Sequence, residues 1–344
     1  MTQERKLSTR RQKLFDRLTK NYSEHLAFDG DKLLKVRVPS HHPVSTGARQ
    51  RLIAHGIPAP EPSTPARTVT ELEDFILAQD NSDLQKVGFG RQVPKDVHYI
   101  PVGKRLFFDF RSADLLMEDL SDGGLNLKEH AVGLDFGCST GRTVRTLAAG
   151  LSHMDWIGVD PVPSSIRYAA NRFPKHTWVV NEQEPPMPIE DNTVDFVLSK
   201  SVWTHFSAAA GIAWIRDIER ILKPGGLVAI TVHGWHDLAR RVFYNMPNPP
   251  YQRLAGVEEL SSEDYLHLVA DEMEESGFHF RPYVATDFQA DLGRLKGSQT
   301  SDWGLTFMTK DWATKNLASS GLELKKRSIA RNGHRHDVLI FQKV

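Results

Sequence analysis

The chain has 344 residues, of which 40% are hydrophobic, so it can bury a substantial core in one large domain or two smaller ones. Basic and acidic residues number 43 each, and the resulting zero net charge argues against a general electrostatic affinity for nucleic acid. The single cysteine, Cys138, excludes an internal disulfide and a cysteine-based zinc site. No apolar run has the length of a membrane span, and the basic N-terminus lacks the apolar segment of a secretory signal. We therefore expect a cytoplasmic protein.

Residues 1–128 are predicted to form a helical and irregular N-terminal region. Near its start, Leu7, Leu14, Phe15 and Leu18 lie on one side of an amphipathic helix. Residues 57–66 contain four prolines and are expected to form an irregular connection. Thr70 is predicted to cap a short helix over residues 71–80. The sequence assigns no function to this region.

From residue 129 the chain alternates between strands and helices. The strands are near-continuous apolar runs, as expected for a parallel sheet that is covered on both faces. Ser207 is predicted to cap a helix over residues 207–222. The expected strands are 131–137, 154–160, 176–180, 193–201 and 225–233, and the helices between them are 141–150, 164–173 and 207–222.

Residues 234–304 interrupt this alternation and are predicted to be an insertion after the fifth strand. The insertion includes a helix over 261–277, with Ser261 or Ser262 as its cap and Gly277 as its end. Loops at the carboxyl ends of parallel strands line the ligand crevice, so the insertion is interpreted as a lid, with an oligomer contact as the alternative. A helix over 309–321 and two strands, 322–330 and 336–343, follow. The short "RNGH" between these strands indicates a hairpin, so we expect an α/β, doubly wound, mostly parallel sheet of seven strands that ends in an antiparallel pair.

The turn after the first strand, "LDFGCSTGRT", spans residues 134–143. Its glycine spacing fits neither the G-x-G-x-x-G dinucleotide fingerprint nor the P-loop. Asp160 ends the second strand, where an acid reaches ribose hydroxyls, and Asn181 or Glu182 follows the third strand, where a side chain can contact adenine. Asp135 precedes the turn and is placed to face a cationic part of the ligand. A cationic ligand that bears adenosine indicates S-adenosylmethionine rather than NAD.

Four segments together resemble the class I S-adenosylmethionine-dependent methyltransferases: "LDFGCSTGRT", "IGVDPVPSSIRYA", "PPMPIEDNTVDFVLSKSVWTHF" and "RILKPGGLVAITVHG". They are most similar to a bacterial branch associated with glycan and other secondary-metabolite pathways. The resemblance is strong over 131–233, weaker over 303–344, and does not extend to 1–128. Ser139 is a departure, because many members have a central glycine there.

The resemblance implies a set of cofactor-binding positions. Backbone amides of the turn approach the methionine part of the cofactor closely, which requires small residues. Lys200 and Ser201 follow the fourth strand, beside the methyl group. Cys138 is interpreted mainly as a small packing residue of the turn. The full set of predicted cofactor residues is Asp135, Gly137, Cys138, Ser139, Gly141, Asp160, Asn181, Glu182, Lys200 and Ser201.

The implied reaction is methyl transfer, for which a hydroxyl acceptor needs a general base. His205 is the first candidate and His233 the second, with His236 also nearby. Alternatively, His233, His236 and Asp237 could hold a divalent cation, and no metal is assigned. Three aromatic residues could stack on an acceptor or pack in the core: Trp203, Trp235 and Tyr244.

The leading hypothesis is O-methylation of a small polar molecule such as a sugar or glycan precursor. The alternatives are N- or C-methylation of another metabolite, an RNA methyltransferase, and a non-catalytic interaction module with the same fold. An NAD-dependent oxidoreductase is disfavoured by the glycine spacing.

Overall fold

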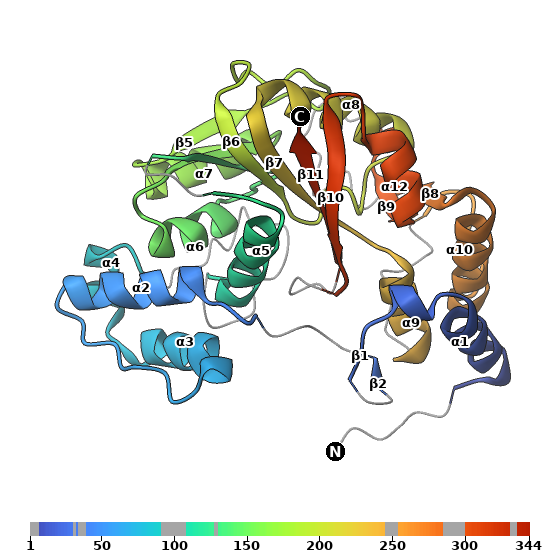
Figure 1. Ribbon diagram of the computed structural model, residues 1–344, viewed down its shortest axis with the longest axis horizontal. Helices are drawn as coiled ribbons and strands as arrows, with labels where there is room; N and C mark the ends of the chain where they lie inside the picture. The colour runs from blue at the N-terminus through green and yellow to red at the C-terminus, as the bar shows by residue number, and fades with distance from the viewer. Residues whose placement is uncertain are drawn as a thin grey trace.

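A computed structural model describes residues 7–29, 32–33, 39–90, 108–126, 130–244, 254–284, 300–330 and 336–344. A seven-stranded sheet occupies the centre of the molecule, in the order β10-β11-β7-β6-β3-β4-β5 (Figure 1). Its strands are β3 (Val132–Phe136), β4 (Asp155–Asp160), β5 (Thr177–Val180), β6 (Val194–Ser199), β7 (Leu222–Val232), β10 (Leu322–Ser328) and β11 (Asp337–Lys343).

Five of these strands, β7, β6, β3, β4 and β5, run parallel to one another. Strand β11 is antiparallel to both of its neighbours, β7 and β10. This arrangement confirms the prediction of a mostly parallel seven-stranded sheet that closes with an antiparallel pair. The predicted "RNGH" turn between β10 and β11 lies outside the described residues.

The two faces of the sheet bury alternate residues of each strand, because successive side chains of a strand point to opposite sides. On one face, Phe196 and Leu198 of β6 pack with α5 (Phe110–Asp122), α6 (Arg142–Gly150) and α7 (Pro163–Arg172). On the other face, Val197 packs with α8 (Ala208–Ile221) and α12 (Lys310–Leu317). Burial on both faces explains why these strands are almost entirely apolar.

The predicted helix ends agree with the structure at α8 and α10 (Ser262–Ser276). The Ser207 side chain accepts a hydrogen bond from the Ala210 amide and so caps α8. Ser261 caps α10, and Gly277 ends that helix in the left-handed conformation. The prediction for Thr70 was wrong, because α3 spans Thr68–Ala78 and Thr70 lies inside it.

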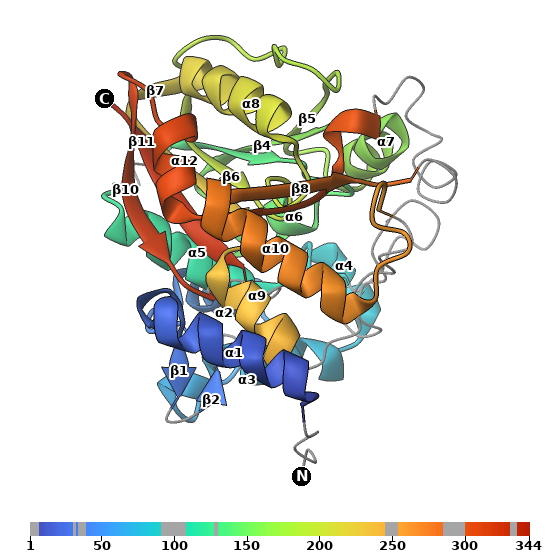
Figure 2. The ribbon, with the colours of Figure 1, turned by 90° about the vertical axis from the view of Figure 1, so that its right-hand side faces the viewer.

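The first helix of the chain packs on the predicted insertion. In Figure 2, α1 (Thr9–Asn21) lies beside α9 (Trp235–Phe243) and α10. Leu14 and Leu18 of α1 belong to the same buried cluster as Leu238 and Leu266. Arg17 adds an ion pair from α1 to Asp271 of α10 at 2.8 Å. Strand β8 (Phe278–Pro282) of the insertion pairs antiparallel with β9 (Gly304–Met308), which begins at the last residue of the insertion. The N-terminal segment adds the short pair β1 (Phe28–Asp29) and β2 (Lys32–Leu33).

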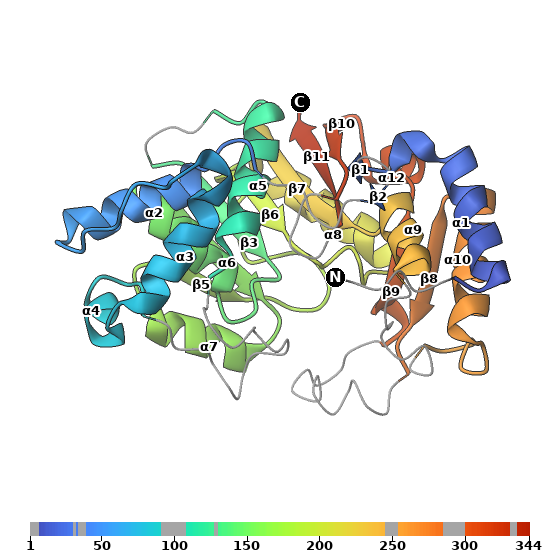
Figure 3. The same ribbon diagram turned by 90° about the horizontal axis from the view of Figure 1, so that it is seen from below.

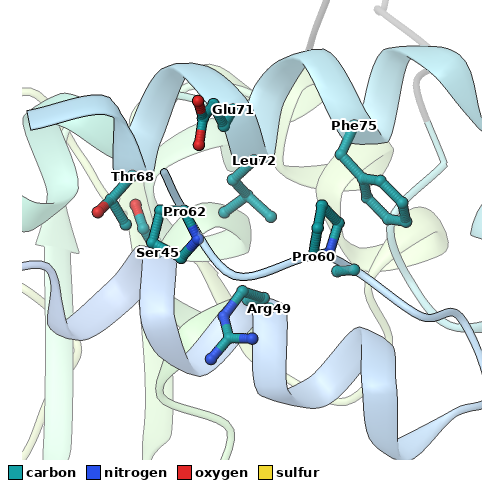
Figure 4. Close-up of a pocket in the computed structure, with 9 residues that line it drawn as sticks. Ser45, Arg49, Pro60, Pro62, Thr68, Glu71, Leu72 and Phe75 are labelled. Atoms are coloured by element: carbon teal, nitrogen blue, oxygen red, sulfur yellow. The ribbon is translucent and has the colours of Figure 1, made fainter. Parts of the chain in front are cut away.

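The rest of the N-terminal region packs on the opposite side of the molecule (Figure 3). Helix α2 (Pro43–Ala54) crosses α6 closely, and a Cβ on Gly47 would lie 2.0 Å from the Gly150 oxygen. Helices α3 and α4 (Asn81–Lys86) follow. A pocket between α2 and α3 is lined by residues of this region alone, among them Ser45, Arg49, Pro60 and Phe75 (Figure 4), and contains none of the predicted site residues. No helix among the described residues is long and apolar enough to cross a bilayer.

Candidate active site

The turn after β3 has a backbone that requires its glycines. Gly137 and Gly141 have φ values of +79° and +81°, in the left-handed region that glycine tolerates best. A Cβ on Gly137 would lie 2.5 Å from Val202 Cγ2, and one on Gly141 would lie 2.4 Å from Trp178 Cη2. Ser139 also has a positive φ of +50°. The turn therefore needs both glycines for conformation and for space, and it lies against the loop that follows β6.

Asp160, at the end of β4, holds this turn in place. Its Oδ2 accepts a hydrogen bond from the Ser139 amide at 2.8 Å, and its Oδ1 accepts one from the Val162 amide at 2.9 Å. Burial raises the pKa of this carboxyl to about 6, although the two hydrogen bonds oppose that shift. Each carboxylate oxygen can accept more than one hydrogen bond, so Asp160 can fix the turn and still accept from ribose hydroxyls.

Asp135 has the environment expected of a residue that faces a cation. Its side chain is only 2% exposed, and its Oδ2 has no hydrogen-bond partner among the described residues. Its pKa is raised to about 7, mainly by burial and also by the charge of Asp160, while the charges of Lys200 and Arg142 oppose the shift. Unpaired buried polar atoms are uncommon and call for an explanation. A positively charged ligand would compensate this carboxylate, so the residues present fit S-adenosylmethionine.

Two more predicted cofactor residues have buried atoms without partners. Ser201 has a positive φ of +61°, its amide donates to Thr231 Oγ1 at 2.6 Å, and its own Oγ has no partner. Asn181 follows β5 and donates from Nδ2 to the Glu182 carbonyl at 2.7 Å, while its Oδ1 has no partner. These atoms are available to a ligand, whereas the Glu182 side chain is exposed to solvent.

Cys138 and Lys200 have partners within the protein. Cys138 is buried in the core beneath the turn, and burial raises the pKa of its thiol, which favours the unreactive neutral form. Lys200 forms an ion pair with Asp109, a residue of the N-terminal region. The sequence prediction did not include Asp109. Asp109 caps a helix whose apolar residues recur at helical spacing, and this pattern in the sequence could have identified Asp109 as the cap.

His205 lies in the loop after β6. Val202, which begins the turn that contains His205, lies against Gly137. The His205 amide donates to the Val202 carbonyl at 2.8 Å. Its Nδ1 lies 2.9 Å from the Gly304 carbonyl, which can only accept, so Nδ1 carries the ring proton. Nε2 is then the unprotonated nitrogen, and it has no hydrogen-bond partner among the described residues. Burial lowers the pKa of His205 to about 4, so the ring is neutral at pH 7.

Two aromatic residues of the predicted insertion surround His205, and sequence reasoning did not identify either of them. The Trp303 ring lies 4.8 Å from the imidazole, between ring centroids, and the Tyr283 hydroxyl lies 3.1 Å from Nδ1. Backbone pairing of Phe206 with Trp303 fixes the insertion against this loop. No motif marks these residues, because only tertiary contacts bring them to His205.

The second base candidate, His233, has both ring nitrogens engaged. Nδ1 lies 2.8 Å from the Thr306 carbonyl, and Nε2 lies 3.4 Å from Arg241 Nη2. The residue is 4% exposed, and burial lowers its pKa to about 3. This arrangement favours a structural role over the predicted role as a base.

The residues of the metal alternative also have other partners. His236 Nδ1 accepts from the Ala27 amide at 3.1 Å, and Asp237 pairs with Arg241 at 2.5 Å and with Arg240 at 3.4 Å. These contacts hold the N-terminal segment and α9 in place.

The three aromatic candidates for acceptor stacking all pack within the protein. Trp203 is fully buried beside Phe136, Trp235 stacks on Tyr22 with centroids 3.9 Å apart, and the Tyr244 hydroxyl donates to the Leu33 carbonyl. Their surfaces are therefore used in the core rather than in binding.

Comparisons with known proteins agree with this geometry. Residues 134–230 match the family model of a methyltransferase domain. No curated protein matches the chain. Among solved structures, the chain is similar to an S-adenosylmethionine-dependent methyltransferase from Methanosarcina mazei, at 17% identity over 63% of this chain and 94% of that one, with a TM-score of 0.41. An amino pentose methyltransferase from Micromonospora echinaspora is 14% identical over 67% of this chain and 90% of that one, with a TM-score of 0.40.

The identification rests on the family-model match, the strand order and the turn after β3. The matched residues 134–230 contain the glycine turn, Asp160 and strands β3 to β6 of the central sheet. The unpaired carboxylate oxygen of Asp135 in that turn suits a cationic cofactor. The chain thus carries a methyltransferase domain, and the residues around its glycine turn fit S-adenosylmethionine.

Proposed function

We propose that this methyltransferase methylates a hydroxyl oxygen of a small polar acceptor, such as a sugar, and that His205 is the general base. The observation that carries the proposal is the tautomer of His205. Its Nδ1 proton is committed to the Gly304 carbonyl, and its Nε2 lone pair has no partner among the described residues. A neutral imidazole with one free nitrogen, in the loop after β6, is suited to accept a proton.

The cofactor supplies a methyl group that is already activated on a positively charged sulfur. The residues Asp135, Asp160, Ser201 and Asn181 would hold it through the unpaired or shared oxygens described above. The contribution of the protein is then to orient the acceptor and to receive its proton. His205 Nε2 would take the hydroxyl proton as the oxygen attacks, and the hydrogen bond to Gly304 would stabilise the resulting charge on the ring.

The surroundings of His205 support an acceptor with a flat or ring-shaped apolar surface. Trp303 and Tyr283 present aromatic rings beside the imidazole, at centroid distances of 4.8 and 5.9 Å. Aromatic faces suit the apolar faces of sugars and planar rings alike. A lid role for the insertion remains part of this proposal, because both aromatic residues belong to it.

The test is a steady-state assay of S-adenosylhomocysteine formation with a panel of sugar nucleotides, simple sugars and phenols, using the wild type, His205→Ala and His153→Ala. We expect His205→Ala to lower kcat by about 10²–10⁴-fold, as for the loss of a general base. Its affinity for S-adenosylmethionine should stay within about twofold, and His153→Ala, an exposed histidine, should behave as wild type. If His205→Ala keeps more than about a third of kcat, the base role is wrong, as expected for an enzyme that methylates nitrogen or carbon.

A further inference from the structure

An ion pair links the cofactor site to a part of the chain that the methyltransferase model does not cover. Lys200, directly after β6, has a side chain that is only 7% exposed, and its ammonium pairs with Asp109. Asp109 caps α5 in the N-terminal region, before the matched residues 134–230. A buried ammonium is unfavourable unless a carboxylate pairs with it. Asp109 is therefore the partner that allows Lys200 to be charged at this position.

Three contacts fix the position of Asp109. Its side chain accepts from the Ser112 amide at 3.3 Å, and its own amide donates to Thr146 Oγ1 of α6 at 3.2 Å. The neighbouring Phe108 ring lies under the Arg145 guanidinium, 3.9 Å from the ring centroid. The Asp109 carboxylate is thus held by α5, and its backbone is held by α6, the helix that begins at the glycine turn.

The same charges act on Asp109 and on the cofactor carboxylate Asp135. Lys200 and Arg142 each lower the pKa of both groups, whereas Asp160 raises the pKa of Asp135. The described groups that face one another are therefore three carboxylates and two cations, contributed by β3, β4, the end of β6, α5 and α6. Without Asp109, two carboxylates and two cations would remain, and this group would lose the net negative charge that favours a cationic ligand.

We propose that Asp109 is a positioning residue that neutralises Lys200 and thereby raises the affinity of the pocket for the positively charged S-adenosylmethionine relative to its affinity for the neutral thioether product, S-adenosylhomocysteine. The unpaired Asp135 Oδ2 is a second, independent sign that a cation belongs in this pocket. The proposal rests on the cofactor alone and does not depend on which acceptor is methylated.

The experiment is calorimetric titration of the full chain with S-adenosylmethionine and, separately, with S-adenosylhomocysteine at pH 8. The readout is the ratio of the two dissociation constants, because contacts that both ligands share cancel in it. In Asp109→Asn, the uncompensated Lys200 ammonium should shift this ratio against S-adenosylmethionine by about tenfold, which corresponds to one charge about 12 Å away at an effective dielectric of about 20. In the double variant Asp109→Asn with Lys200→Met, the ratio should return to within about twofold of wild type.

The matched control is Asp122→Asn, which makes the same change near the other end of α5, where Asp122 pairs with Lys326. It should leave the ratio unchanged. Thermal melts identify any variant that has lost its fold. An unchanged ratio in folded Asp109→Asn would overturn the proposal. If that variant does not fold, Lys200→Met provides the test. Removal of the Lys200 charge should not weaken the binding of a cationic ligand, so a ratio shifted against S-adenosylmethionine in Lys200→Met would overturn the proposal. Wild-type protein that binds neither ligand would instead refute the cofactor assignment itself.

Discussion

Two loops at the same edge of the sheet both carry buried polar side chains, but their hydrogen bonding differs. The turn after β3 and its neighbours contain buried oxygens without partners, on Asp135, Ser201 and Asn181. In the segment after β7, both nitrogens of His233 and both carboxylate oxygens of Asp237 have partners. A buried polar atom that lacks a partner is costly and indicates a ligand, whereas a fully paired one already has a structural function.

This difference matters for the assignment of function, because residue type alone treats the two loops equally. Histidine and aspartate after a parallel strand suit catalysis or metal binding in either place. Their hydrogen bonds separate them. His205 keeps one nitrogen free, and His233 does not. The four predictions that follow test this contrast between an open site and a paired one.

The largest effect is expected from Gly141→Ala in the turn after β3. The new Cβ would be placed at a φ of +81° and 2.4 Å from Trp178, so both strain and overlap would lower the free energy of unfolding, by about 3 kcal/mol. Chemical denaturation would measure this change. Gly225→Ala is the control, because Gly225 has a φ of +78° with nothing within 4 Å, and should lose only the strain contribution of about 1–2 kcal/mol. Equal losses in the two variants would contradict close packing at the turn.

Asp160→Ala should weaken S-adenosylmethionine binding at least about a hundredfold, or about 2.7 kcal/mol. The substitution removes the acceptor of the Ser139 and Val162 amides and the proposed partner of the ribose hydroxyls. Calorimetry would measure the dissociation constant. Asp160→Asn keeps one acceptor oxygen, so its dissociation constant for S-adenosylmethionine should lie between those of the wild type and Asp160→Ala. A loss of less than about fivefold in Asp160→Ala would argue that the carboxylate only supports the turn.

His233→Ala should lower the free energy of unfolding by about 2 kcal/mol, since it leaves the Thr306 carbonyl without its donor and opens a cavity in a buried region. Its effect on kcat should be small once the protein is folded. The pattern for His205→Ala is the reverse, with a large loss of kcat and a smaller loss of stability than in His233→Ala, because His205 is less buried. Urea unfolding and the kinetic assay would be run on both variants, and a large loss of kcat in folded His233→Ala would remove the contrast between the two loops.

The smallest effect concerns pH and Asp135. Its pKa in the folded protein, about 7, lies above that of an unfolded aspartate, so the protonated form stabilises the free protein at low pH, and this contribution is lost as pH rises through 7. Binding of a cation has the opposite dependence, because only the carboxylate attracts it. The affinity for S-adenosylmethionine should therefore rise about tenfold from pH 6 to pH 8. Asp135→Asn should bind weakly and nearly independently of pH, and a slope that persists in this variant would assign the titration to another group, such as Asp160.

Much of the fold could be predicted because its signals are local. Continuous apolar runs indicated parallel strands, Ser207 and Ser261 marked helix starts, and Gly277 marked a helix end. In the turn after β3, Gly137 and Gly141 were informative because a backbone with positive φ at those two positions tolerates few other residues. Asp160 was informative because it ends the neighbouring strand β4. Thr70 was misassigned because threonine occurs inside helices as well as at their caps.

The sequence by itself therefore determined the strands and the glycine turn after β3, since both leave patterns among neighbours along the chain. Only the tertiary structure decided which histidine has a free nitrogen, because the carbonyls of Gly304 and Thr306 come from β9, which is distant in sequence from both histidines. It also brought α1 onto α10 and Asp109 onto Lys200, contacts between segments that are distant in sequence. Such pairings arise from packing and charge complementarity across the folded chain, and no local pattern records them.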